Sequence, residues 1–89
     1  MRISRYSKQF DRDIKLQKRR HKELEKLKTV LRLLLEGVAL PLKNKDHALS
    51  GEFSGYRECH IEPDWLLIYK VEEQVIYFVR TGTHSDLFD

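Results

Sequence analysis

The amino-acid sequence predicts an α+β fold in which a helical hairpin packs on one face of a mainly antiparallel four-stranded sheet. Three observations predict this fold: one strand-like segment at the start, two helical segments after it, and three strand-like segments in the second half. The element order is therefore β-α-α-β-β-β. Strands that are segregated after helices are typical of an α+β arrangement. A chain of 89 residues has room for one hydrophobic core, so we expect residues 1–89 to form a single domain.

The first half of the chain predicts a short strand and two helices. Residues 2–6 are mildly β-prone, and Ser7 is a suitable N-cap for a helix over residues 8–20. In the next segment, apolar side chains recur at helical 3-4 spacing: Leu24, Leu27, Leu31, Leu34 and Val38. Gly37 is a natural C-terminal stop for this second helix. The pattern lasts only about two heptads, which favours a hairpin laid on a sheet over a free coiled coil.

The second half predicts a loop and three strands. Residues 40–55 contain Pro and Gly at several positions, which indicates a loop, and a loop this long in a compact domain is often functional. Strand-like runs follow at residues 56–62, 65–71 and 74–81. Pro63-Asp64 separates the first two runs, and Glu72-Glu73 forms a tight hairpin between the last two. The final residues, 82–89, are too short for more than one turn.

The charge of the chain is divided unevenly between its two halves. The net charge is +3, but residues 1–45 carry 14 Lys and Arg against 5 Asp and Glu, whereas residues 46–89 carry 3 against 9. A basic half of this size attracts phosphate backbones with an affinity that depends on salt. Lys and Arg that merely solvate helix faces would produce the same composition, so charge alone leaves both readings open.

Several features of the sequence indicate the cellular compartment of the protein. The start of the chain has no apolar run behind its positive charges, so we expect no signal peptide there. No stretch approaches the roughly 20 apolar residues of a membrane span, so we expect no association with a membrane. The single Cys59 cannot form an internal disulfide, which is compatible with a reducing compartment. We therefore expect a cytoplasmic protein.

Three of the four histidines lie outside the predicted helices, and they are the candidate catalytic groups. In the strand at residues 56–62, alternation places Cys59 and Ile61 toward the core. Glu58, His60 and Glu62 would then share the open face of the sheet. The loop that holds His47 leads into this strand, and the tail that holds His84 leaves the last strand. Both segments can fold back beside His60.

Two histidines, a carboxylate and an arginine suffice to cut RNA, because RNA carries its own nucleophile in the 2′-hydroxyl. Imidazole exchanges its proton near neutral pH, so a histidine pair can act as base and acid. Asp64 is available as the carboxylate, and Arg80 suits the charge that develops on a phosphate. Trp65 and Phe88 could stack on unpaired bases, at about 1–3 kcal/mol for each base where such stacking occurs.

Simpler interpretations of the same residues remain open. A lone histidine is more often a surface or hydrogen-bonded residue than a catalyst. A tryptophan in a strand more often belongs to the core, Phe88 could simply anchor the tail, and His21 is expected to face solvent. The histidine spacings of 13 and 24 residues match no standard zinc motif, so neither a metal nor a cofactor is expected.

Several motifs closely resemble those of the YafQ-like toxins, a branch of the RelE superfamily of toxin–antitoxin mRNA interferases. The matching stretches cover essentially the full length, and the specific ones are Lys45–Leu49, Gly55–Arg57, His60–Lys70, Arg80–His84 and Leu87-Phe88. The resemblance implies a RelE/ParE-like fold and cleavage of mRNA within the ribosomal A site, leaving a 2′,3′-cyclic phosphate.

The resemblance also implies roles for individual residues. The positions that match the active site of the branch are His47, His60, Asp64, Trp65, His84 and Phe88, and Arg80 matches a phosphate-contacting arginine. In this assignment His84 is the general acid. His60, His47 and Asp64 share the base and orienting roles.

The partners that the resemblance implies are an antitoxin of the RelB/DinJ type, mRNA in the ribosomal A site, and ribosomal RNA contacted through the basic helices. Two alternatives share the fold. A ParE-like toxin would inhibit a topoisomerase and would not need the histidine–aspartate set. A non-catalytic RNA- or protein-binding domain would leave no new transcript ends.

Overall fold

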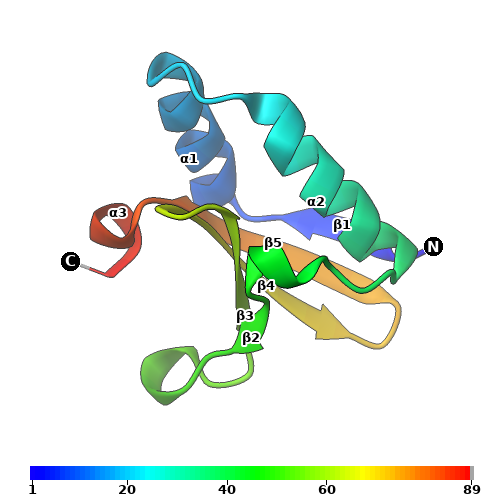
Figure 1. Cartoon of the computed structure of the whole chain (residues 1–89). Coiled ribbons are helices and arrows are strands. Elements are labelled where there is room, and N and C mark those ends of the chain that lie inside the picture. The colour runs from blue at the N-terminus through cyan, green and yellow to red at the C-terminus, as the bar shows by residue number, and fades with distance from the viewer. Residues whose placement is uncertain (89) are drawn as a thin grey trace.

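The computed structural model describes residues 1–88, which form two layers (Figure 1). The helices α1 and α2 cover one face of a sheet, and a short C-terminal helix α3 lies at the other face. The elements in chain order are β1 (Ile3–Tyr6), α1 (Lys8–Arg19), α2 (Leu24–Glu36), η1 (Leu42–Asn44), β2 (His47–Ala48), η2 (Gly51–Phe53), β3 (Arg57–Glu62), β4 (Trp65–Glu72), β5 (Val75–Gly82) and α3 (His84–Phe88). The predicted α+β architecture, with two helices between the first strand and the later strands, is confirmed, but the predicted order lacked β2 and α3.

The sheet has five strands instead of the predicted four, in the order β1-β5-β4-β3-β2. Strand β1 pairs with β5 in parallel, and the remaining pairs are antiparallel. The additional strand β2 lies inside the segment that we predicted to be a loop. It is only two residues long, too short to show alternation, and it is defined by its pairing with Arg57 and Glu58 of β3.

Local chemistry explains where α1 begins and where α2 ends. The Ser7 side chain accepts a hydrogen bond from the Phe10 amide at 2.9 Å, which satisfies one free N–H at the start of α1. At the end of α2, Gly37 adopts a left-handed conformation with φ of 73°, which glycine reaches at little cost. The turn between the helices also contains a left-handed residue, His21, with φ of 61°.

The main core lies between the helices and the sheet. It consists of side chains that are almost fully buried: Phe10, Val30, Leu34, Cys59, Leu67, Tyr69, Ile76 and Phe78. Cys59 is therefore a core residue, as predicted, and burial raises the pKa of its thiol to about 12. The leucine stripe of α2 is thus explained by packing on the sheet.

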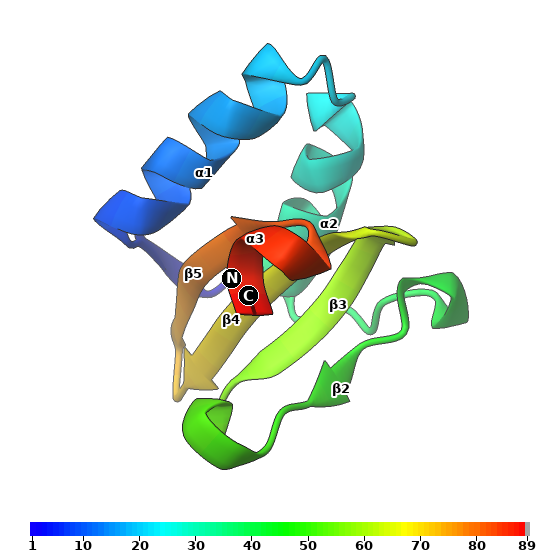
Figure 2. The same ribbon diagram turned by 90° about the vertical axis from the view of Figure 1, so that its left-hand side faces the viewer.

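A second, smaller core lies on the other face of the sheet. Leu66 and Ile68 of β4 pack there against Leu87 of α3, with Leu49, Phe53 and Tyr56 around them. Figure 2 shows α3 lying across this face beside β5 and β4. We call it the open face, because α1 and α2 do not cover it. Among residues 1–88, no helix is both long enough and apolar enough to cross a membrane.

Candidate active site

Three histidines from distant parts of the chain converge on the open face. His47 comes from β2, His60 from β3 and His84 from the start of α3. The ring centroids of His47 and His60 are 6.4 Å apart, and those of His60 and His84 are 6.0 Å apart. We call these three residues, together with Glu58 and Asp64, the histidine cluster. The predicted convergence of loop, strand and tail is therefore present in the structure.

The short pairing of β2 with β3 positions His47. His47 lies directly opposite Glu58 in the antiparallel register, so both side chains point to the same face. The ring Nδ1 of His47 donates a hydrogen bond to the carbonyl oxygen of Lys45 at 2.7 Å. Its Nε2 lies 3.4 Å from Oε1 of Glu58. The backbone thus fixes one nitrogen of the ring and leaves the other facing a carboxylate.

His60 is held in the same manner at the end of β3. Its Nδ1 donates to the carbonyl oxygen of Pro63 at 3.1 Å, and its Nε2 lies 3.8 Å from Oε1 of Glu58. The carboxylate of Glu58 is therefore shared between two imidazoles. The side chain of Glu58 is only 7% exposed, so its charge is screened little by solvent.

His84 forms a separate pair with Asp64. Oδ1 of Asp64 accepts hydrogen bonds from the backbone amide of His84 at 2.9 Å and from its ring Nδ1 at 2.7 Å. These two hydrogen bonds lower the pKa of Asp64, the backbone one contributing most. The carboxylate thus sets the orientation of the ring and leaves Nε2 outside this pairing. All three histidines have Nδ1 anchored, but Nε2 of His47 and of His60 faces Glu58, whereas Nε2 of His84 lies outside its pairing with Asp64.

The position of His84 depends on how α3 is attached to the rest of the fold. Asp86 accepts a hydrogen bond from the Thr83 amide at 2.9 Å, and the Asp86 amide donates to Thr83 Oγ1 at 3.0 Å. This reciprocal pair caps the start of α3. Arg20, at the end of α1, reaches the same carboxylate at 2.6 and 3.0 Å, and this contact is the largest cause of the lowered pKa of Asp86. A cap and a bidentate ion pair therefore hold the helix that carries His84.

Aromatic side chains continue the site along the open face. The ring of Phe88, which is 43% exposed, lies 6.4 Å from His84 and packs edge-on against Phe53 at 5.6 Å. Phe53 in turn contacts Tyr56 edge-on at 6.4 Å. The exposed face of Phe88 beside the histidines suits a stacked base. Its packing on Phe53 also anchors the tail, so both interpretations of Phe88 are compatible with the structure.

Trp65 cannot stack on a base in this structure, and that part of the prediction is wrong. Its side chain is fully buried on the helical side, where Nε1 donates to Thr81 Oγ1 at 2.9 Å. The Thr81 hydroxyl then donates to the carbonyl oxygen of Leu66 at 2.7 Å. Trp65 therefore links β4 to β5 through Thr81, which leaves site shaping as the predicted role for this residue.

Arg80 lies in β5, beyond the residues that pair with β1, and is engaged by α1. Its Nε and Nη2 donate to the carboxylate of Asp13 at 2.8 and 3.3 Å, and the Thr81 amide donates to the same carboxylate at 3.1 Å. Arg80 is paired with Ile68 of the open face, next to a register shift in β5. The pairing with Asp13 does not use Nη1, so the guanidinium keeps donors for a phosphate.

One carboxylate, that of Glu62, differs from what alternation predicted. A register shift between His60 and Glu62 turns Glu62 away from the open face. Glu62 instead bonds Lys22 at 3.2 Å and Lys26 at 2.9 Å, next to α2. Glu58 does lie on the open face, but it was not selected as a site residue. Its position two residues before His60 was the signal that could have identified it.

The described residues contain no group of three or more His, Cys, Asp or Glu side chains arranged to hold a metal ion. The chemistry that the cluster offers is proton transfer. Glu58 can stabilise positive charge on His47 or His60, and Asp64 orients His84. A phosphate placed between His60 and His84 would meet an imidazole on each side.

Comparisons with known proteins identify close relatives. The family described as the bacterial toxin of type II toxin–antitoxin system, YafQ, matches residues 2–89. The mRNA interferase toxin YafQ of Escherichia coli K12 is 49% identical over 84 residues, which cover 93% of this chain and 91% of the relative. The crystal structure of YafQ from E. coli BL21(DE3) superposes with a TM-score of 0.96 at 46% identity, over 100% of both chains. A crystal structure of the E. coli DinJ–YafQ complex is similar, with a TM-score of 0.94 at 47% identity, again over 100% of both chains.

Proposed function

This chain belongs to the family of YafQ toxins of bacterial type II toxin–antitoxin systems, and we propose that it is an mRNA interferase whose histidine cluster cuts RNA by acid–base catalysis. The observation that carries the proposal is the meeting of His47, His60 and His84 on one face, each with Nδ1 anchored. A β-sheet needs no such arrangement for stability. It brings proton donors and acceptors to within the span of a single phosphate.

The reaction assigned to the cluster balances without an external reactant. A neutral imidazole of His60 or His47 takes the proton of the 2′-hydroxyl at its Nε2, and the 2′-oxygen forms a bond to phosphorus. The bond from phosphorus to the 5′-oxygen breaks, and Nε2 of protonated His84 gives its proton to that oxygen. The products are a 2′,3′-cyclic phosphate and a 5′-hydroxyl end. Donor and acceptor groups of this kind typically contribute about 10²–10⁴-fold each to the rate.

The surrounding residues support these roles. Glu58 faces Nε2 of both candidate bases, so it stabilises the imidazolium that forms when the proton is taken. Asp64 is occupied by His84 and therefore orients the acid instead of acting as a base. Arg80 uses two nitrogens for Asp13 and can direct Nη1 to the phosphate.

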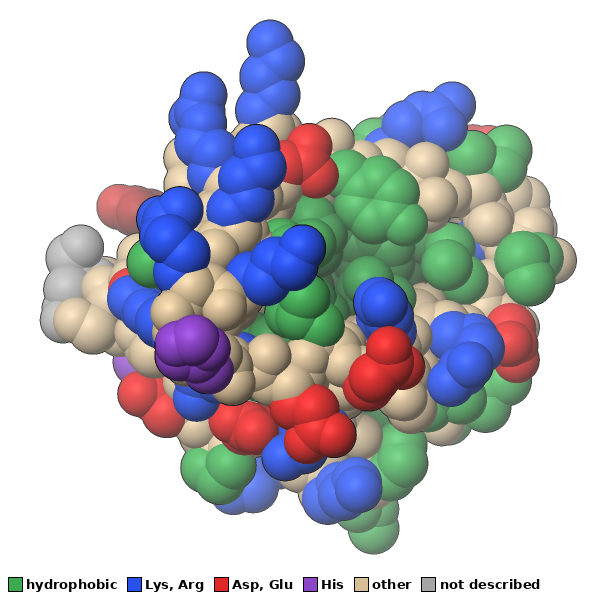
Figure 3. Space-filling model, turned by 90° about the horizontal axis from the view of Figure 1, so that it is seen from above, with side chains coloured by type: hydrophobic (Ala, Val, Ile, Leu, Met, Phe, Trp, Pro, Cys, Tyr) green, Lys and Arg blue, Asp and Glu red, His purple; other side chains and the backbone are tan. Residues whose placement is uncertain are grey.

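The partners in this proposal follow from the relatives. E. coli YafQ forms a complex with DinJ, and we propose a comparable antitoxin for this chain. The basic helices would contact ribosomal RNA, with mRNA in the ribosomal A site as the substrate. Seen from the helical side, Lys and Arg side chains surround an apolar hollow (Figure 3), a surface suited to an acidic, partly apolar partner and to RNA phosphates.

The experiment that tests the function compares two histidines. His84→Asn removes the proposed acid, and His21→Asn removes an exposed histidine at the helical turn, where asparagine tolerates the left-handed backbone. We expect mapped transcript ends to disappear with His84→Asn, at a loss of about 10²-fold or more in rate. His21→Asn should keep them. Equal loss or equal retention in the two variants would refute the assignment, and survival of toxicity without new ends would favour a ParE-like activity.

A further inference from the structure

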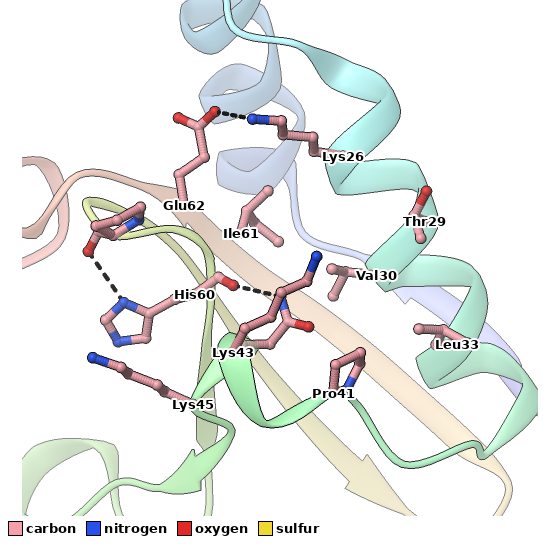
Figure 4. A pocket seen from close by; sticks show the side chains of 12 residues that line it. Lys26, Thr29, Val30, Leu33, Pro41, Lys43, Lys45, His60, Ile61 and Glu62 are labelled. Carbon is pink, nitrogen blue, oxygen red and sulfur yellow. Dashed lines mark hydrogen bonds and ion pairs between the residues drawn. The ribbon is translucent and has the colours of Figure 1, made fainter.

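A groove of about 560 Å³ opens beside His60, between α2 and the segment that contains η1. We call it the edge groove, because it lies along the part of β3 that β2 does not cover. Its floor is apolar, and lysines and a threonine stand at its rim. Val30, Leu33 and Ile61 line the floor, and Lys26, Lys43 and Lys45 are among the residues at the rim. Figure 4 shows these side chains around the opening.

We propose that the edge groove binds the RNA segment next to the scissile phosphate, with Lys43 and Lys45 on its phosphates and a base against its apolar floor. The proposal rests on the proposed function. It adds a place for the substrate strand that lies outside the histidine cluster. None of the groove residues except His60 takes part in the proton transfers described above.

The charge of the rim fits an anion. Of the three lysines, Lys26 is already paired with Glu62 at 2.9 Å. Within residues 1–88, neither Lys43 nor Lys45 has a carboxylate within ion-pair distance, and both are exposed. Two unpaired ammonium groups over an apolar floor match a nucleotide, which combines a phosphate with the apolar face of a base.

The backbone holds Lys45 at the junction of groove and histidine cluster. Lys45 has a left-handed conformation with φ of 47°, which is uncommon for a residue other than glycine and persists where its surroundings fix it. Asn44, which is buried, donates to the carbonyl oxygen of His60 at 2.7 Å, and the Lys45 carbonyl accepts from His47 at 2.7 Å. In Figure 4 the Lys45 side chain extends toward the ring of His60.

Continuity with the histidine cluster distinguishes RNA from other occupants. A strand whose phosphate lies between His60 and His84 must place its neighbouring nucleotides against residues next to His60, and the groove begins at that residue. An acidic helix could also use the lysines and the apolar floor, but nothing in that interaction would require Lys45 to face a histidine. We therefore assign the groove to RNA.

The test measures the binding of a labelled single-stranded RNA octamer by fluorescence anisotropy over a range of salt concentrations. The His84→Asn background keeps the RNA intact. One variant carries Lys43→Gln and Lys45→Asn, because asparagine tolerates the left-handed backbone. The control carries Lys28→Gln and Arg32→Gln, which remove the same charge from an exposed face of α2. Each lost phosphate contact lowers the slope of log affinity against log salt by about 0.7, so the groove variant should lose about 1.4.

The control should keep a slope close to that of the parent. An equal change in both variants, or no change in the groove variant, would overturn the proposal. Loss of antitoxin binding together with an unchanged RNA slope would also overturn it and would assign the groove to a protein. In the active protein the groove substitutions should raise KM with kcat little changed. If wild-type protein leaves no cleaved ends but RNA affinity still depends on Lys43 and Lys45, the proposed function fails while the groove assignment stands.

Discussion

Glu58 is the member of the histidine cluster whose role the sequence indicates least. One buried carboxylate lies 3.4 Å from His47 and 3.8 Å from His60. We predict that Glu58→Gln, which keeps the shape and removes the charge, lowers kcat by roughly 10- to 100-fold, the equivalent of a charged contact of about 1.5–3 kcal/mol. Single-turnover kinetics over a pH series would measure it. Because Glu58 is a positioning residue, Glu58→Gln should move the low-pH limb of the plot of rate against pH. A purely structural role would lower the rate equally at every pH.

Phe88 gives a second prediction at the residue scale. Its ring is 43% exposed and lies 6.4 Å from that of His84. We predict that Phe88→Ala weakens RNA binding by about 1–3 kcal/mol, as expected for one lost stacking contact. Phe88→Trp should restore the affinity, because it supplies another aromatic face. Anisotropy with the RNA octamer compares the variants, and failure of tryptophan to rescue while Phe88→Leu does so would indicate an apolar anchor instead of a stack.

At the scale of elements, α3 is the part on which catalysis depends most. A Cβ built on Gly82 would lie 2.7 Å from Asp86 Oδ2 and 2.9 Å from Asp86 Cβ. Because Asp86 is fixed by Thr83 and Arg20, it cannot yield easily. We predict that Gly82→Ala displaces α3 and removes His84 from the cluster, with a loss of kcat larger than the loss of thermal stability. Unchanged kcat in a folded Gly82→Ala protein would contradict the role given to this close approach.

The clamp on α3 also predicts how stability depends on acid. The Arg20 contact keeps the pKa of Asp86 below its ordinary value of 3.8 in the folded state. A carboxylate with a lowered folded pKa stabilises the fold above its unfolded pKa, and this contribution is lost as the pH falls toward the folded pKa. The contribution of Asp86 to the thermal stability of the wild type should therefore change little between pH 7 and 5. This contribution should decrease below about pH 4. Asp86→Asn should flatten the acid limb, and an acid limb of unchanged steepness would argue against the clamp.

Most helices and strands could be predicted from the sequence, but β2 and the orientation of Glu62 could not. The long elements followed from periodicity, the start of α1 followed from Ser7, and the end of α2 followed from Gly37. Strand β2 could not be predicted, since two residues carry no period and their pairing depends on the distant strand β3. The shift of Glu62 to the helical side could not be predicted either, because a β-bulge reverses the alternation on which the prediction relied.

The candidate site was also predictable only in part. The residue types required for RNA cleavage marked His47, His60, Asp64 and His84, and the structure brings these four together. Burial of Trp65 and engagement of Arg80 by Asp13 depend on tertiary packing, which a single sequence does not display. The edge groove is likewise formed by α2, η1 and β3, three segments that no local motif connects.

For the whole molecule, the division of charge predicts separate surfaces for docking and for chemistry. The basic residues are concentrated in the first half, whereas the histidine cluster comes from the second. We predict that Lys8→Glu combined with Lys15→Glu, both exposed on α1, weakens association with ribosomes strongly and in a salt-dependent manner. The same variant should cut a short free RNA at nearly the wild-type rate, if free RNA is cut at all. Sedimentation with ribosomes measures the first effect, and unaltered sedimentation would place the ribosomal contact elsewhere.

The chemistry of the histidine cluster is tested most directly on the substrate. One mRNA is prepared with a single 2′-deoxy nucleotide at the mapped cleavage position, and its all-ribose counterpart is the control, both bound in the ribosomal A site. Because the nucleophile in this mechanism is the 2′-hydroxyl, the wild-type protein should cut the control, leaving a 2′,3′-cyclic phosphate, and should leave the 2′-deoxy position intact. Cleavage of the 2′-deoxy mRNA at that position would contradict the account.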